Sequence, residues 1–99
     1  MRLLDVRTAE EYHEGHIPGA LLVPLDGLRD SLDRIPRDRS ITVYCRVGYR
    51  SYHAYKILAH HGYQVANLSG GFASWSRAYP DRIEVGAPRE VPALAAPRR

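Results

Sequence analysis

The only cysteine of the chain follows an apolar run, and its neighbours are residue types that can bind an anion. Cys45 comes directly after Ile41-Thr-Val-Tyr44 and is followed by Arg46, Gly48 and Arg50. Backbone N–H groups of a tight loop can converge on one point, and a helix that starts there adds partial positive charge. Such a field favours the thiolate, the nucleophilic form of cysteine. The pattern predicts a strand, an anion-binding loop and a helix, with a reactive thiol at the end of the strand.

The loop residues suit different parts of this chemistry. Gly48 permits the positive φ of a tight cradle, and Ser51 can cap the following helix or donate toward the sulfur. A lone cysteine can also be a small buried core residue with no chemical task, and only its neighbours favour catalysis. We expect Tyr49 at the exposed rim of the loop. We assign Cys45 as catalytic and six residues as substrate-binding: Arg46, Val47, Gly48, Tyr49, Arg50 and Ser51.

Two charged residues accompany the first apolar run of the chain. Asp5 interrupts Leu3-Leu-Asp-Val6, and Arg7 follows it. An aspartate in a buried strand is costly unless it is paired, so we expect it to accept hydrogen bonds from the loop or from an arginine. We assign Asp5 and Arg7 supporting roles near the site, with substrate steering by Arg7 as an open alternative.

Short apolar runs alternate with helical patterns along the chain. Strands are predicted over 3–6, 21–23, 41–44 and 63–68, and helices over 9–14, 25–35, 51–61 and 72–79. The segment Thr8-Ala-Glu-Glu11 has the capping-box pattern at the start of the first helix. This alternation predicts an α/β domain with a mostly parallel sheet flanked by helices. Ligands of such sheets bind at the carboxyl ends of strands, where Cys45 lies.

The composition predicts one small domain and excludes several functions. A chain of 99 residues, 44% of them hydrophobic, supports a single core, which we place at residues 1–80. Residues 81–99 contain prolines and alanines without periodicity, and we expect an extended or disordered tail there. A single cysteine forms no intrachain disulfide and fits a reducing, cytoplasmic location. No apolar run approaches the roughly 20 residues of a membrane span, so we expect no membrane partner.

The charge pattern and the histidines do not indicate nucleic-acid or metal binding. The formal net charge is +3, but the basic residues are scattered and form no basic helix face. The five histidines include the adjacent pair His60 and His61, which face different sides of a helix, and no cysteine pair accompanies them. We therefore expect neither a nucleic-acid partner nor a metal site.

Three segments spanning about residues 3 to 79 form a known pattern: 4–20, 43–51 and 67–75. In this order they resemble a rhodanese-fold sulfurtransferase domain. The loop Cys45-Arg-Val-Gly-Tyr-Arg50, with 52–58 and 67–71 after it, is especially similar to the C-terminal rhodanese domain of coenzyme A disulfide reductases. The strand and helix that usually precede the first segment are missing from this chain. It therefore looks like an excised or trimmed domain, either standalone or the tail of a longer enzyme.

The resemblance implies a small three-layer α/β fold and a sulfur-transfer reaction. The Cys45 thiolate would accept a sulfane sulfur from a donor such as thiosulfate or a persulfide. It would hold that sulfur as a persulfide and pass it to cyanide or a thiol, with a protein thiol or coenzyme A as further candidates. The reductases use flavin and pyridine nucleotide, but this chain has no Gly-x-Gly-x-x-Gly motif, so we expect no cofactor.

Two functions of the same or a related fold remain as alternatives. A non-catalytic interaction module of the rhodanese fold would ordinarily have lost the cysteine. Phosphatases and arsenate reductases of the related fold are the second alternative, and the phosphatases have five residues between cysteine and arginine. Four residues separate Cys45 from Arg50 here, and this smaller ring should suit sulfur and exclude phosphate. Sulfur transfer needs no general base, so no histidine receives a proton-transfer role.

Overall fold

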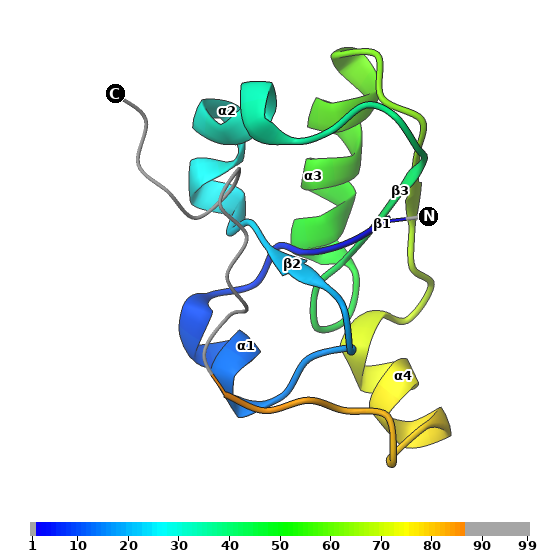
Figure 1. Ribbon diagram of the computed structural model, residues 1–99. Helices are drawn as coiled ribbons and strands as arrows, with labels where there is room; N and C mark the ends of the chain where they lie inside the picture. The colour runs from blue at the N-terminus through cyan, green and yellow to red at the C-terminus, as the bar shows by residue number, and fades with distance from the viewer. Residues whose placement is uncertain (1, 87–99) are drawn as a thin grey trace.

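A parallel sheet lies at the centre of the computed structural model, which describes residues 2–86 (Figure 1). Its four strands run in the order β2-β1-β3-β4, and every pair is parallel. The strands are β1 (Arg2–Asp5), β2 (Leu21–Leu22), β3 (Ile41–Tyr44) and β4 (Val65–Asn67). Parallel neighbours need crossover connections, which helices supply here. The predicted α/β class and parallel sheet are confirmed.

The first helix, α1 (Ala9–Glu14), has the bounds that its capping box predicts. The Glu11 N–H donates to Thr8 Oγ1 at 3.1 Å, and the Thr8 N–H donates back to Glu11 Oε1 at 3.0 Å. These bonds satisfy two backbone donors that a helix start would otherwise leave unpaired. Further along the chain are α3 (Tyr49–His60) and α4 (Gly71–Ala78).

The segment predicted as one helix over 25–35 is instead three short helical turns. They are the 3₁₀ turn η1 (Leu25–Gly27), α2 (Leu28–Ser31) and the 3₁₀ turn η2 (Leu32–Arg34). Gly27 and Ser31 have ψ values of 6° and 1°, which shift the backbone away from α geometry at each junction. The predicted single helix is therefore wrong, although its leucines still pack against the sheet.

The ends of β1, β2, α3, β4 and α4 differ from prediction by one or two residues, and the differences are largest at α3 and β4. Helix α3 begins at Tyr49 instead of residue 51, because Gly48 has a φ of 125° and provides the helix boundary directly. Strand β4 covers 65–67 only. Tyr63, predicted as its first residue, is buried and donates its hydroxyl to the carbonyls of Leu32 and Ile35, at 2.8 and 2.7 Å.

Each face of the sheet has its own core, because alternate residues of a strand point to opposite faces. Leu4, Val43 and Cys45 belong to the core beneath α2 and α3. Tyr44 belongs to the second core, with Tyr12 of α1, and the partly buried Phe72 and Trp75 of α4 pack against it. Figure 1 shows α2 and α3 on one side of the sheet and α1 and α4 on the other. Cys45 thus directly follows β3, on the α3 side of the sheet.

The first residues of the predicted tail lie against the domain. The indole N–H of Trp75 donates to the carbonyl of Arg82 at 2.9 Å. His16 and Glu84 form an antiparallel bridge with backbone N···O distances of 2.8 and 2.9 Å. The Gly86 N–H also donates to the His13 carbonyl of α1 at 2.8 Å. Residues 81–86 are therefore bonded to α4, to α1 and to His16 just after it, whereas the rest of the predicted tail, 87–99, lies outside the described residues. Within 2–86, no helix is long and apolar enough to cross a membrane.

Candidate active site

The sulfur of Cys45 lies at the start of α3, among donors of the loop. Cys45 is 1% exposed. The Gly48 N–H donates to Sγ at 3.1 Å, and Ser51 Oγ lies 3.4 Å from the same atom. Ser51 is fully buried, so its hydroxyl has Sγ as a neighbour in a dry environment. The sequence places a donor loop around the thiol, and the structure brings Gly48 and Ser51 to it.

The surroundings of Cys45 favour its ionised form. Burial alone raises the pKa of this thiol, because it disfavours a charge. Hydrogen bonds from the Ser51 hydroxyl and from the backbone at Ser51, Gly48 and Val47 more than offset burial, so the pKa of Cys45 is lowered. These donors are neutral dipoles aimed at the sulfur. At a given pH, Cys45 is therefore more often in the nucleophilic thiolate form than an ordinary cysteine is.

The N-terminus of α4 holds the outer side of the same loop. The Phe72 N–H donates to the Cys45 carbonyl at 2.8 Å, and the Ala73 N–H donates to the Arg46 carbonyl at 2.9 Å. Gly71 allows this close approach: a Cβ there would lie 2.5 Å from the Cys45 oxygen. Two loop carbonyls are thus bound on the α4 side. Sequence reasoning assigned no site role to this contact, although the Gly70-Gly71 pair could have signalled a close backbone approach.

Arg50 is oriented by an ion pair that the sequence did not predict. Its guanidinium donates to both carboxylate oxygens of Glu11, with Nη1–Oε1 at 2.7 Å and Nη2–Oε2 at 3.0 Å. The hydrogen bond from Arg50 lowers the pKa of Glu11 to about 2, so Glu11 is charged at neutral pH. The charge of Arg50 stays beside the loop, but two of its donors are occupied by Glu11 instead of a substrate.

Asp5 and Arg7 form a buried ion pair on the other face of the sheet from the Cys45 sulfur. Asp5 is 0% and Arg7 3% exposed, and Arg7 Nη2 lies 2.7 Å from Asp5 Oδ2. Arg7 also donates to the Gly15 carbonyl at 2.6 Å, and its guanidinium stacks over the Phe72 ring, 4.4 Å from the centroid. This pair ties β1 to α1 and α4. Its position supports the scaffold around the loop and does not bring Arg7 to the sulfur.

The remaining predicted site residues form the exposed rim of the loop. Arg46 is exposed, Val47 is 53% exposed and Tyr49 is 82% exposed. Their side chains therefore face solvent beside the loop. Within residues 2–86, no group of three or more His, Cys, Asp and Glu side chains is arranged to hold a metal ion.

Comparisons with known proteins agree with this geometry. A sulfurtransferase of Allochromatium vinosum is 43% identical over 76 residues, which cover 76% of this chain and 71% of that protein. The HTH-type transcriptional regulator Rv0324 of Mycobacterium tuberculosis is 40% identical over 88 residues, covering 87% of this chain and 38% of the regulator.

Among solved structures, reduced CoADR-RHD of Bacillus anthracis superposes with a TM-score of 0.79 at 42% identity. The match covers 82% of this chain and 14% of that one, so the chain spans only a small part of CoADR-RHD. The cysteine loop predicts a likeness to the rhodanese domain of coenzyme A disulfide reductases, and this likeness is confirmed. The family model of the rhodanese-like domain matches residues 1–78 of the sequence, and the chain belongs to this family.

Proposed function

We propose that this chain is a sulfurtransferase that carries a sulfane sulfur as a persulfide on Cys45. One observation carries the proposal: the buried Sγ at the end of β3 accepts the Gly48 N–H at 3.1 Å and has the Ser51 hydroxyl beside it. These donors stabilise an anionic sulfur without supplying a proton. The relatives named sulfurtransferase support the same general activity.

The transfer proceeds in two displacements at sulfur. The Cys45 thiolate attacks the outer sulfur of thiosulfate, the S–S bond of thiosulfate breaks, and sulfite leaves with the bonding electron pair. The outer sulfur of the resulting Cys45 persulfide is then attacked by cyanide or by an acceptor thiolate, and the Cys45 thiolate is released. Both nucleophiles react as anions, so the residues around Sγ need only hold negative charge. The need to hold negative charge explains why N–H groups and a hydroxyl surround Sγ.

The proposal extends to partners and location. A persulfide donor would react as thiosulfate does, and the acceptor would be a small thiol, a protein thiol or coenzyme A. The resemblance of the cysteine loop to that of coenzyme A disulfide reductases is the reason for naming coenzyme A as an acceptor. A reactive thiolate keeps its function in a reducing compartment, and we propose the cytoplasm.

Intact-mass measurement tests the reaction directly. We expect incubation with thiosulfate to add one sulfur atom to the chain and to release sulfite, and cyanide to remove the added atom as thiocyanate. Cys45→Ser should show neither step. Absence of both the adduct and sulfite release with thiosulfate and with a persulfide donor would refute the proposal. Turnover of an aryl phosphate that depends on Cys45 would support the phosphatase alternative instead.

A further inference from the structure

The outward side of α3 is a row of exposed aromatic and basic side chains. Side chains three and four positions apart lie on the same side of a helix. Ser51, Ala54 and Leu58 form the side of α3 that is buried in the domain. The opposite side has exposed residues at the same spacing: Tyr49, Tyr52, His53, Lys56 and His60. We name these residues the outer row of α3.

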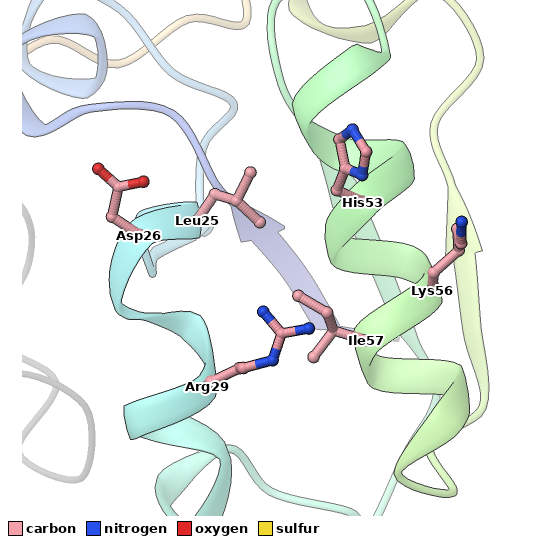
Figure 2. Close-up of a pocket in the computed structure, with 6 residues that line it drawn as sticks. All are labelled: Leu25, Asp26, Arg29, His53, Lys56 and Ile57. Atoms are coloured by element: carbon pink, nitrogen blue, oxygen red, sulfur yellow. The ribbon is translucent and has the colours of Figure 1, made fainter.

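The rings of the outer row are exposed and lie beside one another. Tyr49 is 82% exposed and Tyr52 is 50% exposed. The centre of the Tyr52 ring lies 6.2 Å from that of His53 and 5.3 Å from the Lys56 ammonium. Figure 2 shows Lys56 on the flank of α3, with its ammonium turned away from Arg29. Exposed aromatic side chains are enriched at protein interfaces, and residues 2–86 leave this contact area uncovered.

The sequence around the outer row contains no acidic residue. None of the 11 Asp and Glu residues lies within 39–80, a range that extends from β3 to α4 and contains the cysteine loop. Within residues 2–86, Arg46 and Lys56 form no ion pair, whereas Arg50 is paired with Glu11. Asp26 of η1 lies across a groove from α3, and its carboxylate is directed away from that helix (Figure 2). The positive charges on and beside the outer row are therefore not neutralised by a carboxylate.

The outer row begins at the cysteine loop. Tyr49 is the first residue of α3 and directly follows Gly48, whose N–H donates to the sulfur of Cys45. Arg46 and Val47 come just before it in the loop and are exposed. At a rise of 1.5 Å per residue, α3 extends the row about 17 Å away from the loop. A protein segment that lies along the row would therefore reach the loop with one of its ends.

The number of charges decides which kind of macromolecule fits the row. Tyrosines beside cations can also stack the bases of single-stranded nucleic acid. Nucleic-acid binding, however, depends on neutralising many phosphates, often about six to ten. On the row and in the loop before it, the permanent charges without an ion pair are only Arg46 and Lys56 among the described residues. Two charges beside two exposed tyrosines match a protein segment with a few carboxylates and apolar side chains.

We propose that the outer row of α3 is the docking surface for an acidic, partly apolar segment of the protein that accepts sulfur from Cys45. Tyr49 and Tyr52 pack against the apolar side chains of this segment, and Lys56 pairs with its carboxylates. The role of the partner rests on the proposed function: its thiolate attacks the outer sulfur of the Cys45 persulfide and becomes a persulfide. The Cys45 thiolate departs with the electron pair of the bond that breaks. The surface itself is independent of this reaction, so the two are tested separately.

Binding is measured in Cys45→Ser, which cannot transfer sulfur. The probe is a peptide of three Glu-Glu-Leu repeats, and two control peptides have glutamine for each glutamate or serine for each leucine. The probe should bind more tightly than either control, shift the NMR signals of the His53 ring and leave those of His13 on α1 unchanged. Lys56→Glu should weaken binding of the probe about threefold to tenfold, because a repulsive contact replaces an attractive one. Arg77→Glu, which reverses an exposed charge on α4, is the matched control and should keep the affinity.

Sulfur transfer is measured with the same peptides extended by one cysteine, with thiosulfate as the donor. The native chain should use the acidic peptide with a higher kcat/KM than the glutamine peptide. Lys56→Glu should lose this preference, and its kcat/KM with mercaptoethanol, a small uncharged thiol, should stay unchanged. An equal preference in the native chain and in Lys56→Glu would overturn the outer row as the docking surface.

Other occupants of the row would give different binding results. Tighter binding of oligothymidylate than of the acidic peptide would assign the row to nucleic acid. Shifts of the His53 signals that depend on the concentration of the chain alone would assign it to a second copy. Either result, equal affinity for the acidic and glutamine peptides, or an equal loss in Arg77→Glu would overturn the acidic protein partner.

The two measurements separate the docking surface from the reaction. If sulfur transfer to cyanide fails but the acidic peptide binds and shifts the His53 signals, the proposed function is wrong and the docking surface stands. If transfer to cyanide succeeds and the His53 signals do not move, the outer row is not the docking surface.

Discussion

Replacing Gly71 by alanine tests whether α4 keeps the cysteine loop in its reactive shape. The added Cβ would lie 2.5 Å from the Cys45 carbonyl oxygen and 2.7 Å from that of Arg46. Ordinary contact begins at 3.4 Å, so the loop or α4 must retreat by about 0.9 Å. Such a shift would lengthen or break the hydrogen bonds between α4 and the loop, which measure 2.8 and 2.9 Å. The loop should therefore lose its fixed position over Sγ.

The expected consequence is a less stable thiolate at Cys45. A hydrogen bond to a charged group contributes about 1.5 kcal/mol or more, and weakening the 3.1 Å contact from the Gly48 N–H removes much of that. A loss of about 1.4 kcal/mol is a tenfold change in an ionisation equilibrium, so the pKa of Cys45 should rise. The pH dependence of the rate of alkylation by iodoacetamide reports the pKa of Cys45. At pH 7 the variant should react up to about tenfold more slowly.

Gly19→Ala provides the matched control. Gly19 has a φ of +85° and Gly71 a φ of +59°, so alanine is strained by the backbone at both positions. At Gly19, however, nothing lies within 4 Å of the added Cβ. Both variants should lower the melting temperature, but only Gly71→Ala should displace the alkylation profile. Equal profiles in the two variants would refute the role of α4 in positioning the loop.

Three further substitutions test the other contacts of the site. Ser51→Ala should also raise the pKa of Cys45 and slow its alkylation at neutral pH. Ser51→Thr, which keeps the hydroxyl, should restore part of the rate. An unchanged pH profile of alkylation in Ser51→Ala would contradict the contact between Ser51 and Sγ. Because Arg50 lowers the folded-state pKa of Glu11 to about 2, their pair stabilises the fold above the unfolded-state pKa of about 4.3 and is lost as the pH falls toward 2. Glu11→Gln should therefore cost about 0.2–1 kcal/mol at neutral pH in chemical denaturation and progressively less as the pH falls through 2, and a constant difference would be the contrary result. Asp5→Asn leaves a buried guanidinium without its carboxylate and should lower the free energy of unfolding by about 3–5 kcal/mol, and a loss below 1 kcal/mol would show that the pair is dispensable.

The chain shows clearly which parts of a fold short patterns can predict. Thr8 and Glu11 lie three residues apart, so their capping box is visible in the sequence and fixes the start of α1. Cys45 follows a β-branched run, which makes the strand end predictable as well. The helix over 25–35 failed because apolar spacing shows which side chains face the core, but not whether the backbone makes α or 3₁₀ hydrogen bonds.

The contacts that complete the site join residues far apart in the sequence. Glu11 and Arg50 are 39 residues apart. The capping box already explained why a glutamate occupies position 11, so its second role as the partner of Arg50 was not expected. The bond from the Phe72 N–H to the Cys45 carbonyl depends on how closely α4 approaches β3, which is a property of packing. Such contacts follow from the fold as a whole, so local residue types predicted the reactive thiol but not the elements that position its loop.

These contacts also bear on the choice between sulfur and phosphate. With Gly48 at the N-cap, Arg50 is the second residue of α3, and its guanidinium is bound in two places by Glu11. Glu11 is itself held by the Thr8 capping box. A phosphate group bound over the thiol would need several donors beyond the sulfur, and arginine is the usual bidentate one. Here that arginine is engaged, while the Gly48 N–H and the Ser51 hydroxyl face Sγ itself. The site is therefore suited to stabilise charge on sulfur, as sulfur transfer requires.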